Sequence, residues 1–131
     1  MLEKRRGEII NVFSTAGFQP VPYTTVCSAT KACVTSFSLA LAEEVRGYGV
    51  AVVTLCPGGT RTNFFHASQY RTRDLPGGLQ RPEEVVDAGL KALERGGGLV
   101  VPRLMNKLGV FSQRLVPRSL ATRIAARIFR V

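Results

Sequence analysis

The chain has 131 residues, enough for one domain with a hydrophobic core but few for a complete two-layer nucleotide-binding enzyme. With 45% hydrophobic and 8% aromatic residues, its composition excludes a disordered protein. No uninterrupted apolar run approaches the roughly 18 residues of a membrane span, and the charged residues 2–7 argue against a secretory signal. The three cysteines are odd in number and lack CxxC or metal-ligand spacing, so we expect a reducing, cytoplasmic setting and no metal site.

The net charge of +9 is unevenly distributed. Residues 103–131 contain seven basic residues and no acidic one, whereas acids and bases are mixed in the part before them. Because no nucleic-acid-binding motif or interleaved aromatic pattern accompanies the charge, no nucleic-acid partner is expected.

The first hundred residues read as alternating strands and helices. "EIINVFS" (8–14) and "GVAVVTLCPG" (49–58) are continuous apolar runs that predict buried parallel strands. Between them, apolar residues recur every three to four positions and predict a helix over 24–46, with the repeat Val26, Ala29, Cys33, Phe37, Leu41 and Val45. Strand, helix and strand in this order make a right-handed βαβ unit.

The second half begins with an aperiodic loop. Residues 60–81 lack a period and carry Pro76, Gly77 and Gly78, which is typical of an extended binding loop or lid. A capped helix follows from Pro82, then a short strand in "GLVVP" (98–102), then two amphipathic helical segments divided at Pro117. We therefore expect an α/β domain with about three parallel strands over 1–102 and a basic helical tail over 103–131.

Two segments carry a family resemblance. "GEIINVFSTAGF" (7–18) and "PYTTVCSATKACVTSFSLALAEEVRGYGVAVVTLCPGGTRTNFF" (22–65) resemble the C-terminal half of a short-chain dehydrogenase/reductase. That family has a serine at a strand end, a tyrosine thirteen residues later, a lysine four further on, and a Pro-Gly turn followed by threonine. In this chain Ser14, Cys27, Lys31 and Pro57-Gly58 stand at those positions, and Thr62 matches the threonine.

The resemblance implies a Rossmann-like, doubly wound sheet and a site for NADP or NAD with a small carbonyl or alcohol substrate. Ser14 would bind the substrate carbonyl, position 27 would exchange the proton, and Lys31 would assist it and hold the nicotinamide ribose. Pro57, Gly58, Thr60 and Thr62 would contact the cofactor. Independently of the family, residues four apart share one helix face, and a serine at a parallel strand's carboxyl end lies where α/β folds bind ligands.

Two departures qualify this expectation. Cys27 replaces the tyrosine: a thiol is acidic enough, but its sulfur lies several ångströms nearer the backbone than a phenol oxygen, beyond direct reach of the substrate. The glycine-rich turn that holds the cofactor diphosphate is absent from the chain. We therefore expect a truncated oxidoreductase that is impaired on its own, with an unpaired strand edge and a tendency to self-associate.

Other readings of the same residues stay open. Ser14 could only bond its own backbone, Lys31 could be an ordinary solvated lysine, and Cys27 could be an inert replacement or a reactive thiol. Cys33 and Cys56 read as core residues. The helix over 24–46 could form a subunit interface in a homo-oligomer or in a non-catalytic module, and the basic tail could rest on a membrane surface, although packing against the domain is favoured.

Overall fold

The three expected strands form one parallel sheet. In a computed structural model that describes residues 1–64 and 78–129, the strand order is β1-β2-β3. The register pairs Ile10 with Val53 and Val53 with Gly98. The strands are β1 (Gly7–Val12), β2 (Val50–Leu55) and β3 (Gly98–Val100). The predicted α/β class with a three-stranded parallel sheet is confirmed.

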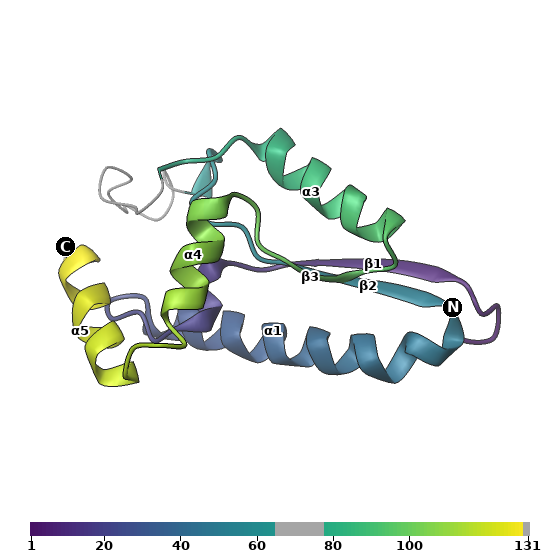
Figure 1. Ribbon diagram of the computed structural model, residues 1–131, viewed down its shortest axis with the longest axis horizontal. Coiled ribbons are helices and arrows are strands. Elements are labelled where there is room, and N and C mark those ends of the chain that lie inside the picture. Colours follow the sequence, from purple (N-terminus) through teal and green to yellow (C-terminus); the bar gives the residue numbers. More distant parts are fainter. Residues whose placement is uncertain (65–77, 130–131) are drawn as a thin grey trace.

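Two helices cover the faces of this sheet (Figure 1). Helix α1 (Thr25–Val45) lies on one face and α3 (Pro82–Glu94) on the other. Glu83 and Glu84 occupy the first turn of α3, where carboxylates are favoured by the helix dipole. The central strand β2 is almost wholly buried between the helices, and its residues form the core with Val85 and Ala92 on one side and Val45 on the other.

The short elements gather at the carboxyl ends of the strands (Figure 1). They are η1 (Thr15–Phe18), α4 (Leu104–Ser112) and α5 (Arg118–Ile128), while η2 (Arg46–Tyr48) leads from α1 into β2. The start of α4 is tied to α3 because Glu84 accepts from both Arg81 (3.1 Å) and Arg103 (3.2 Å). These contacts hold the pKa of Glu84 below its ordinary value, and the hydrogen bond from Arg81 has the largest effect.

Strand β1 has the unpaired edge that the sequence predicts, and it is less buried than the apolar run alone indicates. It pairs only with β2, so its other edge has no strand partner among the described residues. Val12 is 58% exposed, whereas Val53 at the centre of the sheet is fully buried. A continuous apolar run indicates a strand, but it does not say whether a neighbour covers that strand on both edges.

Helix α1 packs with its polar side inward. Its buried residues are Ser28, Thr35, Ser38 and Val45, and Ser38 accepts a 2.7 Å hydrogen bond from the Asn11 amide of β1. The apolar repeat that predicts the helix lies largely outward, with Val26 78% and Phe37 59% exposed. Cys33 is also exposed, so its assignment to the core is wrong, whereas Cys56 is buried as expected.

The segment Thr25–Tyr48 is long and apolar enough to cross a membrane, by length and composition alone, with a mean hydropathy of 1.3. The sequence expectation rests on uninterrupted apolar runs only. Serines and threonines interrupt the apolar residues of this segment, but they do not lower its mean hydropathy below that of a possible membrane span. In the fold the segment lies against the sheet, as the covering helix of an α/β domain does.

Candidate active site

Backbone hydrogen bonds continue past the ends of β1 and β2 and place Ser14 beside the Pro-Gly turn. The Phe13 amide donates to Leu55 (2.8 Å), and the Thr15 amide donates to Pro57 (2.9 Å). Ser14 lies between these two bonds. The parallel pairing of the strands therefore brings the predicted catalytic serine next to Pro57-Gly58, although 43 positions separate residues 14 and 57 in the sequence.

A glycine lets η1 approach the backbone of α1. A Cβ atom on Gly17 would lie 3.0 Å from the Lys31 carbonyl carbon and oxygen and 3.2 Å from the Ala32 amide nitrogen. Such contacts are tighter than side chains normally make, so the absent side chain is what lets the two segments meet. The turn that begins at Ser14 is thereby held against the helix that carries Cys27 and Lys31.

All the predicted site residues line one cleft. It has a volume of about 780 Å³ and is bounded by η1, the first turns of α1, the segment after β2, and helices α4 and α5. The predicted residues in its wall are Ser14, Cys27, Lys31, Pro57, Gly58, Thr60 and Thr62. The structure thus brings the predicted residues together, while the role of each stays a prediction.

The hydroxyl of Ser14 is oriented by its own turn. Ser14 caps η1, and its Oγ accepts a 3.2 Å hydrogen bond from the Ala16 amide. This is the bond to neighbouring backbone that is expected if Ser14 has no catalytic role. It is also compatible with function, because a hydroxyl that accepts from an amide still has its own O–H to donate into the cleft.

Cys27 and Lys31 enter the cleft from successive turns of α1. Cys27 is exposed and Lys31 is half-buried. Among the described residues the Lys31 ammonium has no carboxylate partner, so it supplies an unpaired positive charge to the cleft wall. Tyr23, the nearest phenol in the sequence, is 57% exposed and is not part of that wall.

The segment after the Pro-Gly turn is held by Gln80. Thr60 forms an isolated bridge with Gln80, its hydroxyl donates to Gly58 (3.1 Å), and it accepts from the Gln80 amide (3.4 Å). The Thr62 hydroxyl accepts from the Phe64 amide (3.4 Å). Most of the predicted loop and the single histidine, His66, lie outside the described residues.

The tail supplies cleft residues that the sequence did not single out. Asn106 of α4 lies against Gly58, where an added Cβ would be 2.6 Å from its amide nitrogen, and its amide donates to Pro102 (3.1 Å). Gln113 also lines the cleft, and within the described chain its buried Oε1 has no hydrogen-bond partner. The only sequence signal for these residues was the amphipathic pattern of the tail.

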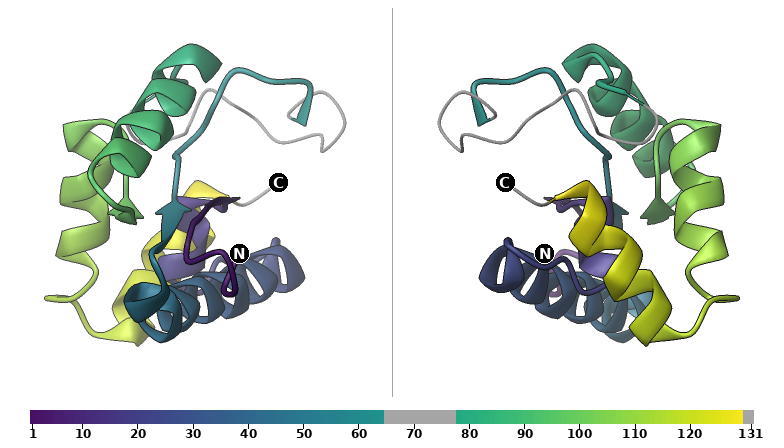
Figure 2. Two further views of the ribbon diagram at one scale, coloured as in Figure 1. Left: turned by 90° about the vertical axis from the view of Figure 1, so that its right-hand side faces the viewer. Right: turned by 90° about the vertical axis from the view of Figure 1, so that its left-hand side faces the viewer.

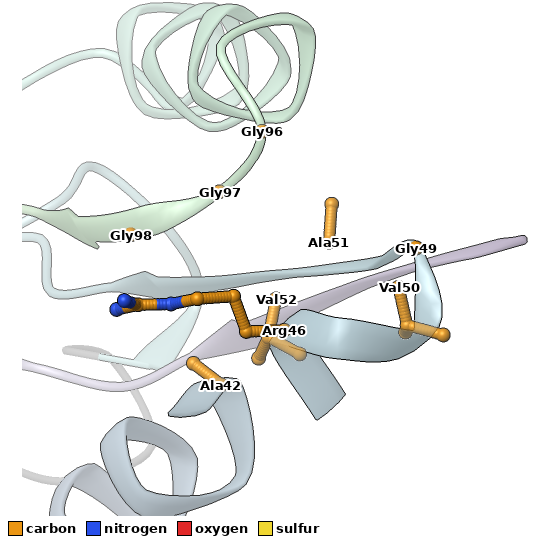
Figure 3. A pocket seen from close by; sticks show the side chains of 9 residues that line it. All are labelled: Ala42, Arg46, Gly49, Val50, Ala51, Val52, Gly96, Gly97 and Gly98. Atoms are coloured by element: carbon orange, nitrogen blue, oxygen red, sulfur yellow. The ribbon is translucent and has the colours of Figure 1, made fainter. Parts of the chain in front are cut away.

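A second, smaller cleft of about 450 Å³ lies near the amino-terminal ends of β2 and β3 (Figure 3). Its wall includes Gly96, Gly97 and Gly98, and its one charged side chain, Arg46, pairs with Glu43 (2.5 Å). It therefore lacks the grouped reactive side chains of the first cleft. The described residues contain no group of three His, Cys, Asp or Glu side chains that could hold a metal ion.

Comparison with known proteins agrees with this α/β fold. The profile of the short chain dehydrogenase family matches residues 1–72, more than half of the chain. The human very-long-chain 3-oxoacyl-CoA reductase is 34% identical over 111 residues, covering 82% of this chain and 34% of the reductase. Mouse estradiol 17-beta-dehydrogenase 2 is 43% identical over 63 residues, covering 48% of this chain and 16% of that protein.

Solved structures extend the likeness over nearly the whole chain. A short chain dehydrogenase from Burkholderia cenocepacia in complex with NADP has a TM-score of 0.74 at 26% identity, covering 95% of this chain and 50% of that one. A short-chain dehydrogenase from Sphingobium yanoikuyae in complex with NADPH has a TM-score of 0.71 at 28% identity, covering 87% and 46%. The architecture is thus the carboxyl-terminal part of a Rossmann-like domain.

The chain belongs to the short-chain dehydrogenase family. It spans about half the length of these solved relatives and about a third or less of the curated relatives named above.

Replacing Gly17 by alanine tests the contact that holds the site together. The added methyl group would press on the backbone of Lys31, so we expect a loss of roughly 1–3 kcal/mol in the free energy of unfolding. Gly47→Ala is the matched control, because nothing lies within 4 Å of a Cβ there. Urea denaturation measures both variants, and equal stability would refute the close-approach argument.

Thiol labelling tests the different environments of the three cysteines. Burial raises the pKa of Cys56 to about 11, although a hydrogen bond with Thr35 acts in the opposite direction and lowers the pKa. At pH 8 an aromatic disulfide reagent should therefore label two thiols of the folded chain quickly and the third only after unfolding. Cys33→Ser should leave one fast thiol, that of Cys27. Three fast thiols would show that Cys56 is not held in the core.

Proposed function

We propose that this chain forms the catalytic and nicotinamide-side part of an NAD(P)-dependent oxidoreductase that interconverts carbonyl compounds and alcohols. The observation that supports it is the convergence of Ser14, Cys27 and Lys31 with the Pro57-Gly58 turn on one cleft. Relatives named as dehydrogenases and reductases, two of them in complex with NADP or NADPH, support the same reaction class. With half the length of those solved structures, the chain is expected to be impaired on its own.

The described residues fit one half of the dinucleotide. The unpaired ammonium of Lys31, the side-chain-free Gly58 and the hydroxyls of Thr60 and Thr62 suit a nicotinamide riboside. No glycine-rich turn for the diphosphate occurs in the sequence. When bound, NADP or NAD supplies or accepts the hydride.

Side chains in the cleft bind the substrate, stabilise charge and transfer the proton. The Ser14 hydroxyl, oriented by the Ala16 amide, donates to the substrate carbonyl oxygen. The positive charge of Lys31 stabilises negative charge that develops near it in the cleft. Because the Cys27 sulfur is short of the position that a phenol oxygen would reach, its proton transfer runs through a water molecule, at a cost in rate.

Restoring the phenol should raise activity. With NADPH and a panel of ketones and aldehydes, Cys27→Tyr should increase the rate of cofactor oxidation about 100-fold or more, the typical gain from a positioned acid. Absorbance at 340 nm measures the rate. Cys33→Tyr, on the exposed outer side of the same helix, is the control and should change nothing.

A binding measurement separates loss of chemistry from loss of the site. Saturation-transfer NMR with nicotinamide mononucleotide should detect contact with the chain, and Lys31→Met should weaken it about tenfold, as expected for one charge-assisted contact. The proposal fails if Cys27→Tyr is as inactive as the control and neither the chain nor this variant binds the mononucleotide.

The outward side of α1 is proposed to form a homo-oligomer interface. Val26 and Phe37 are largely exposed on the side opposite the sheet-facing Ser28 and Thr35. The cellular setting proposed for the oligomer is the cytoplasm, in keeping with three free cysteines, and cell fractionation tests it.

Two variants separate the routes to self-association. If α1 is the interface, Phe37→Asp should shift the chain to monomer in sedimentation-velocity runs, since a carboxylate cannot be buried there without a partner. Val12→Asp, which alters the unpaired edge of β1, should leave the oligomer unchanged. The reverse pattern would assign the association to the strand edge.

A further inference from the structure

The outer side of α4 carries a row of exposed apolar side chains. Its members, spaced by four, three and four residues, are 54–74% exposed, and we call them the α4 stripe: Leu104, Leu108, Phe111 and Leu115. Isolated exposed leucines are common on protein surfaces, but four large ones on one side of a short helix form a contiguous patch.

Helical geometry puts this stripe opposite the core. At about 100° per residue, the four positions lie within about 60° of one another, and Leu115 extends the row through the turn that follows the helix. Asn106 and Val110 lie on the opposite side, where Asn106 meets Gly58 and Val110 packs on the cluster of Phe13 and Cys56. Of the stripe only Leu108 also borders the cleft, so Leu104, Phe111 and Leu115 are not needed to hold α4 on the domain.

The stripe also lies away from the free edge of the sheet. In Figure 2, α4 stands on the flank of β3, while β1 lies on the opposite flank of the sheet. Strands that paired with the open edge of β1 would extend the sheet away from α4. Extension of the sheet at the β1 edge would therefore leave the α4 stripe uncovered.

Charge identifies the kind of surface that fits the stripe. Residues 103–131 have seven basic residues and no acidic one. Lys107 and Arg114 flank the stripe and are seven positions apart in the sequence. Stripe-to-stripe contact with a second copy would bring these like charges together. An anionic lipid surface satisfies both features, since it accepts apolar side chains and attracts lysine and arginine.

We propose that the α4 stripe docks on an anionic membrane surface. Helix α4 lies in the plane of the interface, with Leu104, Phe111 and Leu115 inserted among the acyl chains and Lys107 and Arg114 at the lipid phosphates. This differs from the surface that the sequence suggested on α5, because Ala121 and Ala125 of α5 pack inward and Ile124 and Ile128 line the catalytic cleft. The docking does not depend on the proposed enzymatic activity.

Vesicle flotation with the full chain tests the proposal. Vesicles of equal parts phosphatidylcholine and phosphatidylglycerol should carry the protein upward at physiological salt, and phosphatidylcholine vesicles should carry at least tenfold less. Phe111→Ser with Leu115→Ser should reduce binding at least tenfold. Lys107→Glu with Arg114→Glu should reduce it similarly and remove its dependence on salt.

Matched substitutions on α3 provide the control. Val86 and Leu90 are 55% and 50% exposed, and they stand near Glu83 and Asp87 rather than among basic residues alone. Val86→Ser with Leu90→Ser should leave vesicle binding within twofold of the unaltered chain, and circular dichroism should confirm that every variant is folded. The proposal is overturned if the chain does not float with anionic vesicles, if both serine pairs act alike, or if the α4 pair only dissolves a dimer.

Discussion

The candidate site depends on the backbone pairing that continues beyond the ends of β1 and β2. The bonds from the Phe13 amide to Leu55 and from the Thr15 amide to Pro57 bracket Ser14 and fix it beside the Pro-Gly turn. Gly17 then allows the same segment to rest on the backbone of α1 at Lys31. A strand-end hydroxyl and a helix-borne ammonium meet on one cleft because these two main-chain approaches, neither of which involves a catalytic side chain, set their positions.

The elements and the convergence of the site follow from regularities that are local in sequence. Apolar runs closed by glycine and proline predict β2, and the capping signals around Pro82 predict α3, because both patterns reflect one segment's own hydrogen bonds and burial. The meeting of Ser14 with Cys27 and Lys31 could be predicted because parallel strands end at one edge and residues four apart share a helix face.

What the sequence did not reveal depends on neighbours. The small residues Ser28, Thr35 and Ser38 of α1 face the sheet, so most of the apolar repeat that identifies the helix is exposed, Cys33 included, and only its end near Val45 packs in the core. Asn106 and Gln113 enter the cleft only because the tail folds back over the strand ends, which no pattern within residues 103–131 encodes.

The contact between Gly58 and Asn106 couples two positions that 48 residues separate in the sequence. Any side chain at position 58 would collide with the Asn106 amide, which in turn is held by the Pro102 carbonyl. A larger residue at 58 would require the Asn106 side chain to leave its bond with Pro102 or to be replaced by a smaller one. In evolutionary terms the two positions should change in concert, so that substitutions in the turn beside Ser14 are matched by substitutions in the tail that covers it.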